Sequence, residues 1–266
     1  MSSWSVESLC TPGCATDGGP RMPLSGIARR YASLAATLLR SVAMGERLGA
    51  PETLRERAGE VLDGLDVRIE LRKAPGAEPL TVPGPVGTLV VANHISWLDI
   101  VAFLAVEPRL TLLAKREVGA WPVVGTLARR IGTRFIDREG LRQLPQTVAD
   151  LSDTLRSGRS VVVFPQATTW CTVAGGSFRP ATFQAAIDAG APVRPVSLDY
   201  FQHGRPTTVA AFLGEEDFGT GLRRVAGTRG LSVRITPHRT LAGTDRRSLA
   251  SAAQRAVVGT ESPAHV

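Results

Sequence analysis

The segment from Thr88 to Asp99 reads TLVVANHISWLD, and it places polar residues where an apolar strand gives way to a helix. Thr88–Ala92 is almost wholly apolar, which is typical of a strand buried on both faces of a parallel sheet. Ser96-x-x-Asp99 is a capping-box pattern, so we expect a helix over Trp97–Val106. Because α/β proteins build their sites at the ends of strands, His94 lies where a site is expected.

Short apolar runs alternate with helical patterns on both sides of this segment. Such an alternation predicts an α/β fold with a mixed, largely parallel sheet flanked by helices. The candidate strands are Asp66–Arg72, Thr88–Ala92, Leu110–Lys115, Arg134–Ile136, Ser160–Phe164, Val193–Asp199, Thr208–Leu213 and Leu231–Ile235. The candidate helices are Trp97–Val106, Trp121–Arg130, Leu141–Ser157, Ala181–Ala189 and Leu249–Val258.

An amphipathic helix is predicted at the N-terminal side, over residues 25–48. Its apolar residues are Ile27, Tyr31, Leu34, Leu38 and Val42, and Arg29, Arg40 and Arg47 lie nearly opposite them. Such a helix either packs on the domain or lies in a membrane interface with its arginines on headgroups. We expect residues 1–24 to be a disordered lead, residues 25–258 a single domain and residues 259–266 a frayed tail.

The composition is that of a globular protein and argues against a disordered or membrane-spanning chain. The 266 residues are 43 % hydrophobic and 21 % charged, as in a globular domain. No apolar run approaches the roughly 18 residues that a membrane-spanning helix needs. The formal net charge of +7 favours an anionic partner, which is a nucleic acid, a membrane surface or a phosphorylated substrate.

The three cysteines predict neither disulfides nor a metal site. Cys10 and Cys14 lie in the expected lead, and they lack the second pair that a zinc site would want. An odd, sparse set with Cys171 is not a disulfide framework, so we expect a reducing, cytoplasmic compartment.

His94 and Asp99 are the candidate catalytic pair. Five residues on a continuous helix would turn the two side chains apart, so they meet only if His94 precedes the helix and Asp99 lies in its first turn. The alternative is that Asp99 only caps the helix and His94 is an ordinary turn residue. His203 and His238 lie among turn residues, and we expect them to be exposed to solvent.

Four blocks of sequence, in order, resemble the glycerolipid acyltransferases of the lysophosphatidic acid acyltransferase type. The first is Asn93-His94-x4-Asp99, which is followed by Leu113–Glu117 and Trp121-Pro122. The others are Gly132–Arg138, then Val163–Thr169, then Phe178–Pro180 with Gly190–Val196. The similarity covers roughly residues 87–200.

The resemblance implies acyl transfer from acyl-CoA or acyl-carrier protein to the hydroxyl of a lysophospholipid, without a cofactor or metal. His94 would act as general base and Asp99 would orient it. The protein would then lie peripherally on the anionic inner face of the cell membrane. A nucleic-acid binder is disfavoured, because aromatic residues for stacking on bases make up only 5 % of the chain.

Substrate-binding residues also follow from the resemblance. Arg138 matches the family's arginine in the second block, and Arg179 and Lys115 are further candidate cations. The third block departs from the family pattern: Gln166 stands for Glu, Ala167 for Gly and Thr169 for Arg or Ser, while Thr168 matches. These changes leave two alternatives open, a phosphate-free acceptor such as a lyso-ornithine lipid and a non-catalytic lipid-binding relative.

Overall fold

One mixed sheet runs through the molecule in this computed structural model, which describes residues 8–16, 19, 21–72, 79–136 and 143–259. The strand order is β1-β8-β6-β2-β5-β3-β4, and β7 pairs with β6. The strands are β1 (Val67–Leu71), β2 (Leu89–Ala92), β3 (Thr111–Lys115), β4 (Arg134–Ile136), β5 (Val161–Val163), β6 (Val193–Gln202), β7 (Arg205–Pro206) and β8 (Leu231–Pro237).

The pairing confirms a largely parallel sheet. Strands β6, β2, β5, β3 and β4 are parallel neighbours, and β1 is parallel to β8, whereas β8 and β7 run antiparallel to β6. Leu89 of β2 lies opposite Val161 of β5 and Val193 of β6. Every residue of β2 is fully buried, so this strand lies in the centre of the sheet. Sites of α/β proteins form at the carboxyl ends of such parallel strands, and His94 follows the carboxyl end of β2.

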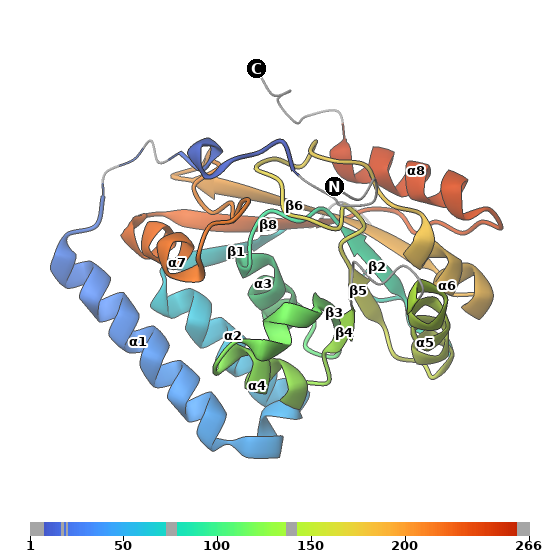
Figure 1. Cartoon of the computed structure of the whole chain (residues 1–266), viewed down its shortest axis with the longest axis horizontal. Helices are drawn as coiled ribbons and strands as arrows, with labels where there is room; N and C mark the ends of the chain where they lie inside the picture. The colour runs from blue at the N-terminus through green and yellow to red at the C-terminus, as the bar shows by residue number, and fades with distance from the viewer. Residues whose placement is uncertain (1–7, 17–18, 20, 73–78, 137–142, 260–266) are drawn as a thin grey trace.

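Helices cover both faces of the sheet, as the sequence predicts (Figure 1). The helices α1, α2, α3 and α7 lie on one side, and α5, α6 and α8 lie on the other. Their bounds are α1 (Leu24–Ala43), α2 (Pro51–Gly64), α3 (Leu98–Val106), α4 (Val124–Arg130), α5 (Leu144–Arg156), α6 (Ala181–Ala189), α7 (Phe218–Gly227) and α8 (Arg246–Val258). The described residues also form the 3-10 helices η1 (Pro12–Cys14), η2 (Gly45–Gly49) and η3 (Arg116–Ala120).

The predicted strand Thr208–Leu213 is wrong, because this stretch is a loop in the structure. Its backbone finds partners elsewhere: Arg224 of α7 donates to the carbonyls of Val209 (2.8 Å) and Ala211. A buried loop is tolerated when side chains satisfy its polar groups in this way. The helices α2 and α7 were not predicted, although Asp217 caps α7 by accepting from the Thr220 amide at 3.0 Å.

Helix α1 packs on the domain through the face predicted to be apolar. Leu34 is buried, and Ile27 and Leu38 are half-buried against the core. Arg30 is also buried on this face, with only 4 % of its surface exposed. Its guanidinium donates to the carbonyls of Ala226 (3.0 Å) and Thr228 and forms an ion pair with Asp66 at 2.7 Å.

Part of the expected disordered lead is ordered against the domain. Cys10 is 4 % exposed, and the Thr208 hydroxyl donates to the Cys14 carbonyl at 2.7 Å. The Met22 amide donates to the Gly227 carbonyl at 2.8 Å. These long-range contacts fix residues that carry no periodic pattern of their own. The expected tail, apart from Gly259, lies outside the described residues.

Replacing Arg30 by Met should lower the free energy of unfolding by about 2–6 kcal/mol. The substitution keeps most of the apolar volume but leaves two buried carbonyls without donors, at about 1–3 kcal/mol each. Denaturation by urea measures the change. Arg29→Met, at the exposed neighbouring position, is the matched control and should cost less than about 0.5 kcal/mol. Equal losses in the two variants would show that the buried contacts of Arg30 do not stabilise the fold.

Candidate active site

His94 and Asp99 meet in the turn between β2 and α3. His94 follows the end of β2, and Asp99 is the second residue of α3. The distance between His94 Nδ1 and Asp99 Oδ2 is 2.8 Å. The arrangement is the one that the sequence required, with the histidine before the helix and the carboxylate in its first turn.

The Asp99 carboxylate is fully buried and accepts several hydrogen bonds. Besides His94, its Oδ2 accepts from the amides of Ile95 (2.8 Å) and Ser96 (2.9 Å). The bond to Ser96 is the reach-back bond of a capping box. Asp99 therefore caps the helix and holds His94 with the same carboxylate, so the two interpretations of the sequence are compatible.

Tyr200 on β6 supports Asp99 from the other side, and no role was predicted for this residue from the sequence. Its hydroxyl donates to Asp99 Oδ1 at 2.7 Å. Burial, and then the charge of Asp99 and the hydrogen bond to it, raise the pKa of Tyr200 well above its usual value. The phenol thus stays a neutral donor. A tyrosine directly after the predicted strand Val193–Asp199 was the available signal, because a buried hydroxyl needs a partner.

The His94 ring is held by stacking as well. It lies on the ring of Phe164, with 4.1 Å between centroids and an angle of 20° between planes. Phe164 directly follows β5, the parallel neighbour of β2. The His94 side chain is 16 % exposed. Since Nδ1 is engaged by Asp99, Nε2 is the nitrogen left for a substrate, and no described residue bonds to it.

The third sequence block braces the backbone of His94. Gln166, which is 2 % exposed, accepts from the His94 amide at 2.8 Å through Oε1 and donates through Nε2 to the Gly175 carbonyl. The Trp170 amide donates to the His94 carbonyl at 2.8 Å. The amide of Gln166 suits two opposite partners at once, whereas a carboxylate there would face the Gly175 carbonyl with a second acceptor.

The other altered residues of this block, Ala167 and Thr169, shape and hold the loop that follows β5. Ala167 has a φ of 61°, in the left-handed region where glycine is the usual residue. Thr169 donates its hydroxyl to the Phe212 carbonyl, and the Phe212 amide donates to the Ile95 carbonyl at 2.9 Å. Thr168 is half-buried between them. These contacts make the block a support for the turn that carries His94.

The candidate cations are more scattered. Lys115 ends β3 and pairs with Glu117 at 3.2 Å, and both side chains are largely exposed. The Arg179 side chain is exposed, while its amide donates to the Pro165 carbonyl at 3.0 Å beside the third block. Arg138 lies outside the described residues, two positions after the end of β4.

The other described histidines do not form a comparable pair. His203 is exposed, as expected. His238 is half-buried rather than exposed, because its Nε2 lies 2.7 Å from the Ser197 hydroxyl beneath α8. Burial, with a smaller effect from the charge of Arg72, lowers the pKa of His238. Neither ring is bonded to a carboxylate in the described part of the chain, so His94 is the candidate base.

Comparisons with known proteins identify relatives of this chain. A family model described as Acyltransferase matches residues 77–199. The chain is 36 % identical to a 1-acyl-sn-glycerol-3-phosphate acyltransferase of Neisseria meningitidis, over 70 % of this chain and 72 % of that one. It is also 36 % identical to a lyso-ornithine lipid O-acyltransferase of Pseudomonas aeruginosa, over 84 % of this chain and 90 % of that one.

A solved structure shares the fold. It is the 1-acyl-sn-glycerophosphate acyltransferase PlsC of Thermotoga maritima, with a TM-score of 0.61 and 20 % identity. The similarity covers 88 % of this chain and 92 % of that one.

Tyr200→Phe should lower the free energy of unfolding by about 1.5–3 kcal/mol, because it removes a hydrogen bond to a buried charge while the ring still fills its space. Thermal or urea denaturation measures the loss. Tyr31→Phe is the matched control, since Tyr31 is the other tyrosine and its hydroxyl bonds to no described residue. A loss no larger than that of Tyr31→Phe would mean that the Tyr200 hydroxyl does not support Asp99.

Proposed function

This chain belongs to the lysophosphatidic acid acyltransferase family, and we propose that it transfers a fatty acyl group from a thioester to a lysolipid hydroxyl with His94 as general base. The observation that carries the proposal is the His94–Asp99 pair at the carboxyl end of β2, held by Tyr200 and stacked on Phe164. We further propose that residues 25–258 form a single acyltransferase domain around the one sheet.

The proton transfers of the proposed step use the side chains described above. Nε2 of His94 takes the proton of the acceptor hydroxyl while its oxygen attacks the carbonyl carbon of the thioester. When the tetrahedral intermediate collapses, the carbon–sulfur bond breaks and the imidazolium returns the proton to the leaving thiolate. Asp99 keeps the proton of His94 on Nδ1 and stabilises the imidazolium. General base catalysis of this kind contributes about 10² to 10⁴ in rate.

We propose lysophosphatidic acid as the acceptor, giving phosphatidic acid, and acyl-CoA or acyl-carrier protein as the donor. The similarity to the Neisseria enzyme and the arginine at position 138 support this assignment. Arg138 would grip the acceptor phosphate, because a guanidinium binds phosphate oxygens with two parallel hydrogen bonds. Arg179 and Lys115 are secondary candidates for this role.

A lyso-ornithine lipid is the second candidate acceptor. The third block offers Thr169 in place of the arginine of some relatives, and its hydroxyl is already bonded to the Phe212 carbonyl. The similarity to the Pseudomonas enzyme extends over more of both chains than the similarity to the Neisseria enzyme. An acceptor without phosphate would place less demand on fixed cations at this site.

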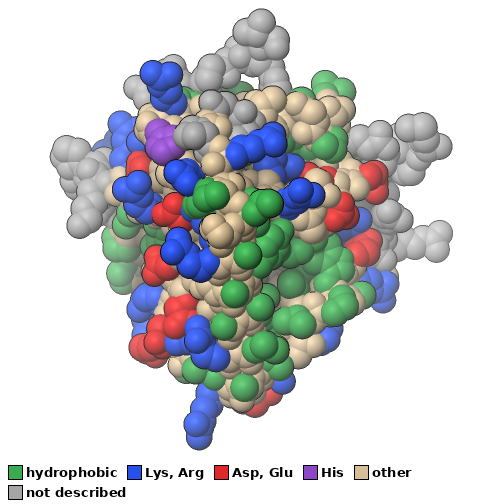
Figure 2. Space-filling model, turned by 90° about the vertical axis from the view of Figure 1, so that its left-hand side faces the viewer, with side chains coloured by type: hydrophobic (Ala, Val, Ile, Leu, Met, Phe, Trp, Pro, Cys, Tyr) green, Lys and Arg blue, Asp and Glu red, His purple; other side chains and the backbone are tan. Residues whose placement is uncertain are grey.

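We also propose that the outer face of α1 contacts the membrane, in place of the face predicted from sequence, which packs on the domain. Leu24 (81 %) and Leu39 (70 %) are exposed on α1, in line with exposed alanines of the same helix. Figure 2 shows this side of the molecule, where apolar side chains lie among basic ones. None of the described helices combines the length with the apolar composition that a bilayer-spanning helix requires.

His94→Ala should lower kcat by at least about 10², because the general base is lost. Asp99→Asn should also impair turnover, since it disturbs the tautomer of His94. Thiol release from a fatty acyl-CoA with lysophosphatidic acid as acceptor measures the rate. His203→Ala, an exposed histidine, is the control and should leave kcat unchanged. Near-normal transfer by His94→Ala would rule out the mechanism.

Arg138→Ala should raise the KM for lysophosphatidic acid by about 10- to 150-fold, because it removes a charge-assisted hydrogen bond that contributes about 1.5–3 kcal/mol to binding. The KM for the thioester should stay nearly constant. Kinetics with both substrates varied measure the two values, with Arg134→Ala on β4 as the control. Equal rises in both KM values would mean a structural arginine, and a wild-type KM in Arg138→Ala would favour the phosphate-free acceptor.

Leu24→Glu combined with Leu39→Glu should weaken binding to anionic vesicles by at least about 10-fold, because it puts charge on the face proposed to enter the membrane. Sedimentation with vesicles measures the binding, which should also weaken at high salt. Leu71→Glu on β1 is the matched control, since Leu71 is an exposed leucine away from α1. If the double variant binds as well as the control, another surface makes the contact.

A further inference from the structure

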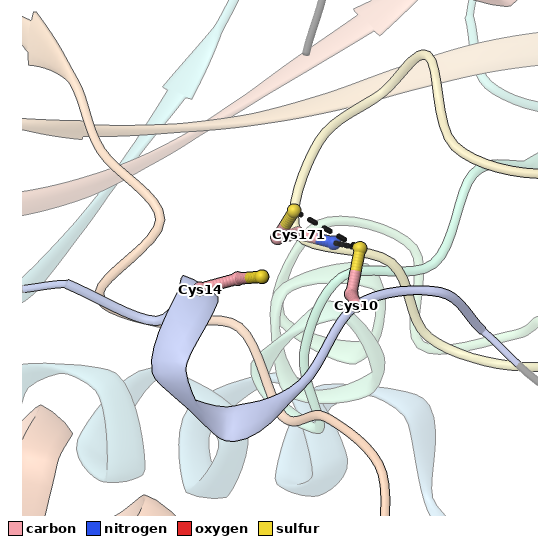
Figure 3. Close-up of side chains that lie close together, drawn as sticks. All are labelled: Cys10, Cys14 and Cys171. Carbon is pink, nitrogen blue, oxygen red and sulfur yellow. Dashed lines mark hydrogen bonds between the residues drawn. The ribbon is translucent and has the colours of Figure 1, made fainter. Parts of the chain in front are cut away.

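All three cysteines of the chain converge on one point (Figure 3). Cys10 and Cys14 lie at the N-terminal side, with Cys14 in η1, and Cys171 lies in the loop after the third block. Their sulfur atoms all lie within 4.8 Å of one another. Cys10 and Cys171, 161 positions apart, have their sulfurs 3.1 Å apart in the buried interior. The sequence did not predict this group, because it showed only the first pair as neighbours.

The arrangement matches the requirements of a thiolate metal site. Cys10 and Cys14 are separated by three residues, within the two to four that zinc sites commonly place between paired cysteines. Two sulfurs bound at about 2.3 Å to one tetrahedral ion lie about 3.8 Å apart. The observed sulfur separations, from 3.1 Å to at most 4.8 Å, bracket that distance.

We propose that Cys10, Cys14 and Cys171 bind one thiophilic metal ion of the Zn²⁺ class, which fastens the N-terminal lead to the loop beside the active site. Binding replaces the S–H bond of each thiol by a sulfur–metal bond and releases the protons to the solvent. The described residues supply three ligands, and water would take the fourth position of the tetrahedral ion.

The backbone beside Cys171 also supports the site. The Cys171 amide donates to the Cys10 sulfur, with 3.5 Å between the nitrogen and the sulfur. A hydrogen bond of this kind orients a metal ligand from outside the coordination shell. Cys10 and Cys171 are both buried, so a thiolate at either position needs such a donor or a bound cation.

A disulfide explains the group less well. A bond between Cys10 and Cys171 would need the sulfurs to close from 3.1 Å to about 2.05 Å, and it would leave Cys14 without a role. Yet η1 brings Cys14 to the same point, and the Thr208 hydroxyl fixes it there by donating to its carbonyl. The convergence of three sulfurs, rather than two, favours the metal.

The position of the site gives it a structural role near the catalytic pair. Cys171 directly follows Trp170, whose amide donates to the His94 carbonyl. A metal ion there would hold the Trp170 end of this contact in place, without touching substrate. The site does not depend on the acyl-transfer reaction.

The test is the metal content of the full chain, produced without a histidine tag in zinc-supplemented medium and kept reduced. Mass spectrometry of the elements should find about one zinc per chain. Replacing zinc by Co²⁺ should give the sulfur-to-cobalt charge-transfer absorption of a thiolate site. Removing zinc with a chelator should lower the Tm by about 5–10 °C and expose three thiols to a thiol reagent.

Variants separate this site from adventitious binding. Cys171→Ser should lose zinc and the cobalt absorption. Cys14 is half-buried, so Cys14→Ser should disturb the fold less, and its affinity for zinc should fall by at least about 10-fold. His203→Gln, an exposed histidine, should keep both. Zinc retained equally by all three variants would overturn the proposal. So would reduced protein that binds no zinc, or purified protein whose mass is two hydrogens lower through a Cys10–Cys171 disulfide.

Discussion

A carboxylate removed from water is stable in a protein only if hydrogen bonds replace its hydration, and Asp99 meets this requirement with four donors. They are the His94 ring, the amides of Ile95 and Ser96, and the Tyr200 hydroxyl. The donors come from the β2–α3 turn and from β6. The position of the candidate base therefore depends on the parallel pairing of β2 with β6, and not on the turn alone.

Neighbouring strands contribute to the same end. Asn93 binds both the amide and the carbonyl of Leu198 on β6, at 2.8 and 2.9 Å, so the chain leaves the sheet at a fixed point just before His94. From the other neighbour, β5, come Phe164 beneath the imidazole and Gln166 on the His94 amide. The third block therefore supports the site although Gln166 replaces the family's carboxylate, because the side-chain amide of Gln166 holds the backbone of His94.

The sequence was sufficient where the information was local. Apolar runs predicted β2, β3 and β5 to within a residue or two, and the spacing of Ser96 and Asp99 placed the turn that carries His94. It failed where distant groups decide the structure. Thr208–Leu213 has the composition of a strand, but it forms a loop whose carbonyls accept hydrogen bonds from Arg224. Tyr200 bonds to Asp99, which lies 101 positions away in the sequence, and Cys171 contacts Cys10, which lies 161 positions away. No local pattern reveals contacts between residues so far apart.

Chemical rescue of a His94→Gly variant tests the central claim most directly, because it returns the missing base as a free molecule. If His94 takes the proton of the acceptor, added imidazole should restore acyl transfer in proportion to its neutral fraction, in the space above Phe164. The same imidazole should do much less for a variant that also carries Asp99→Asn. Transfer by His94→Gly at the wild-type rate without imidazole would contradict the account.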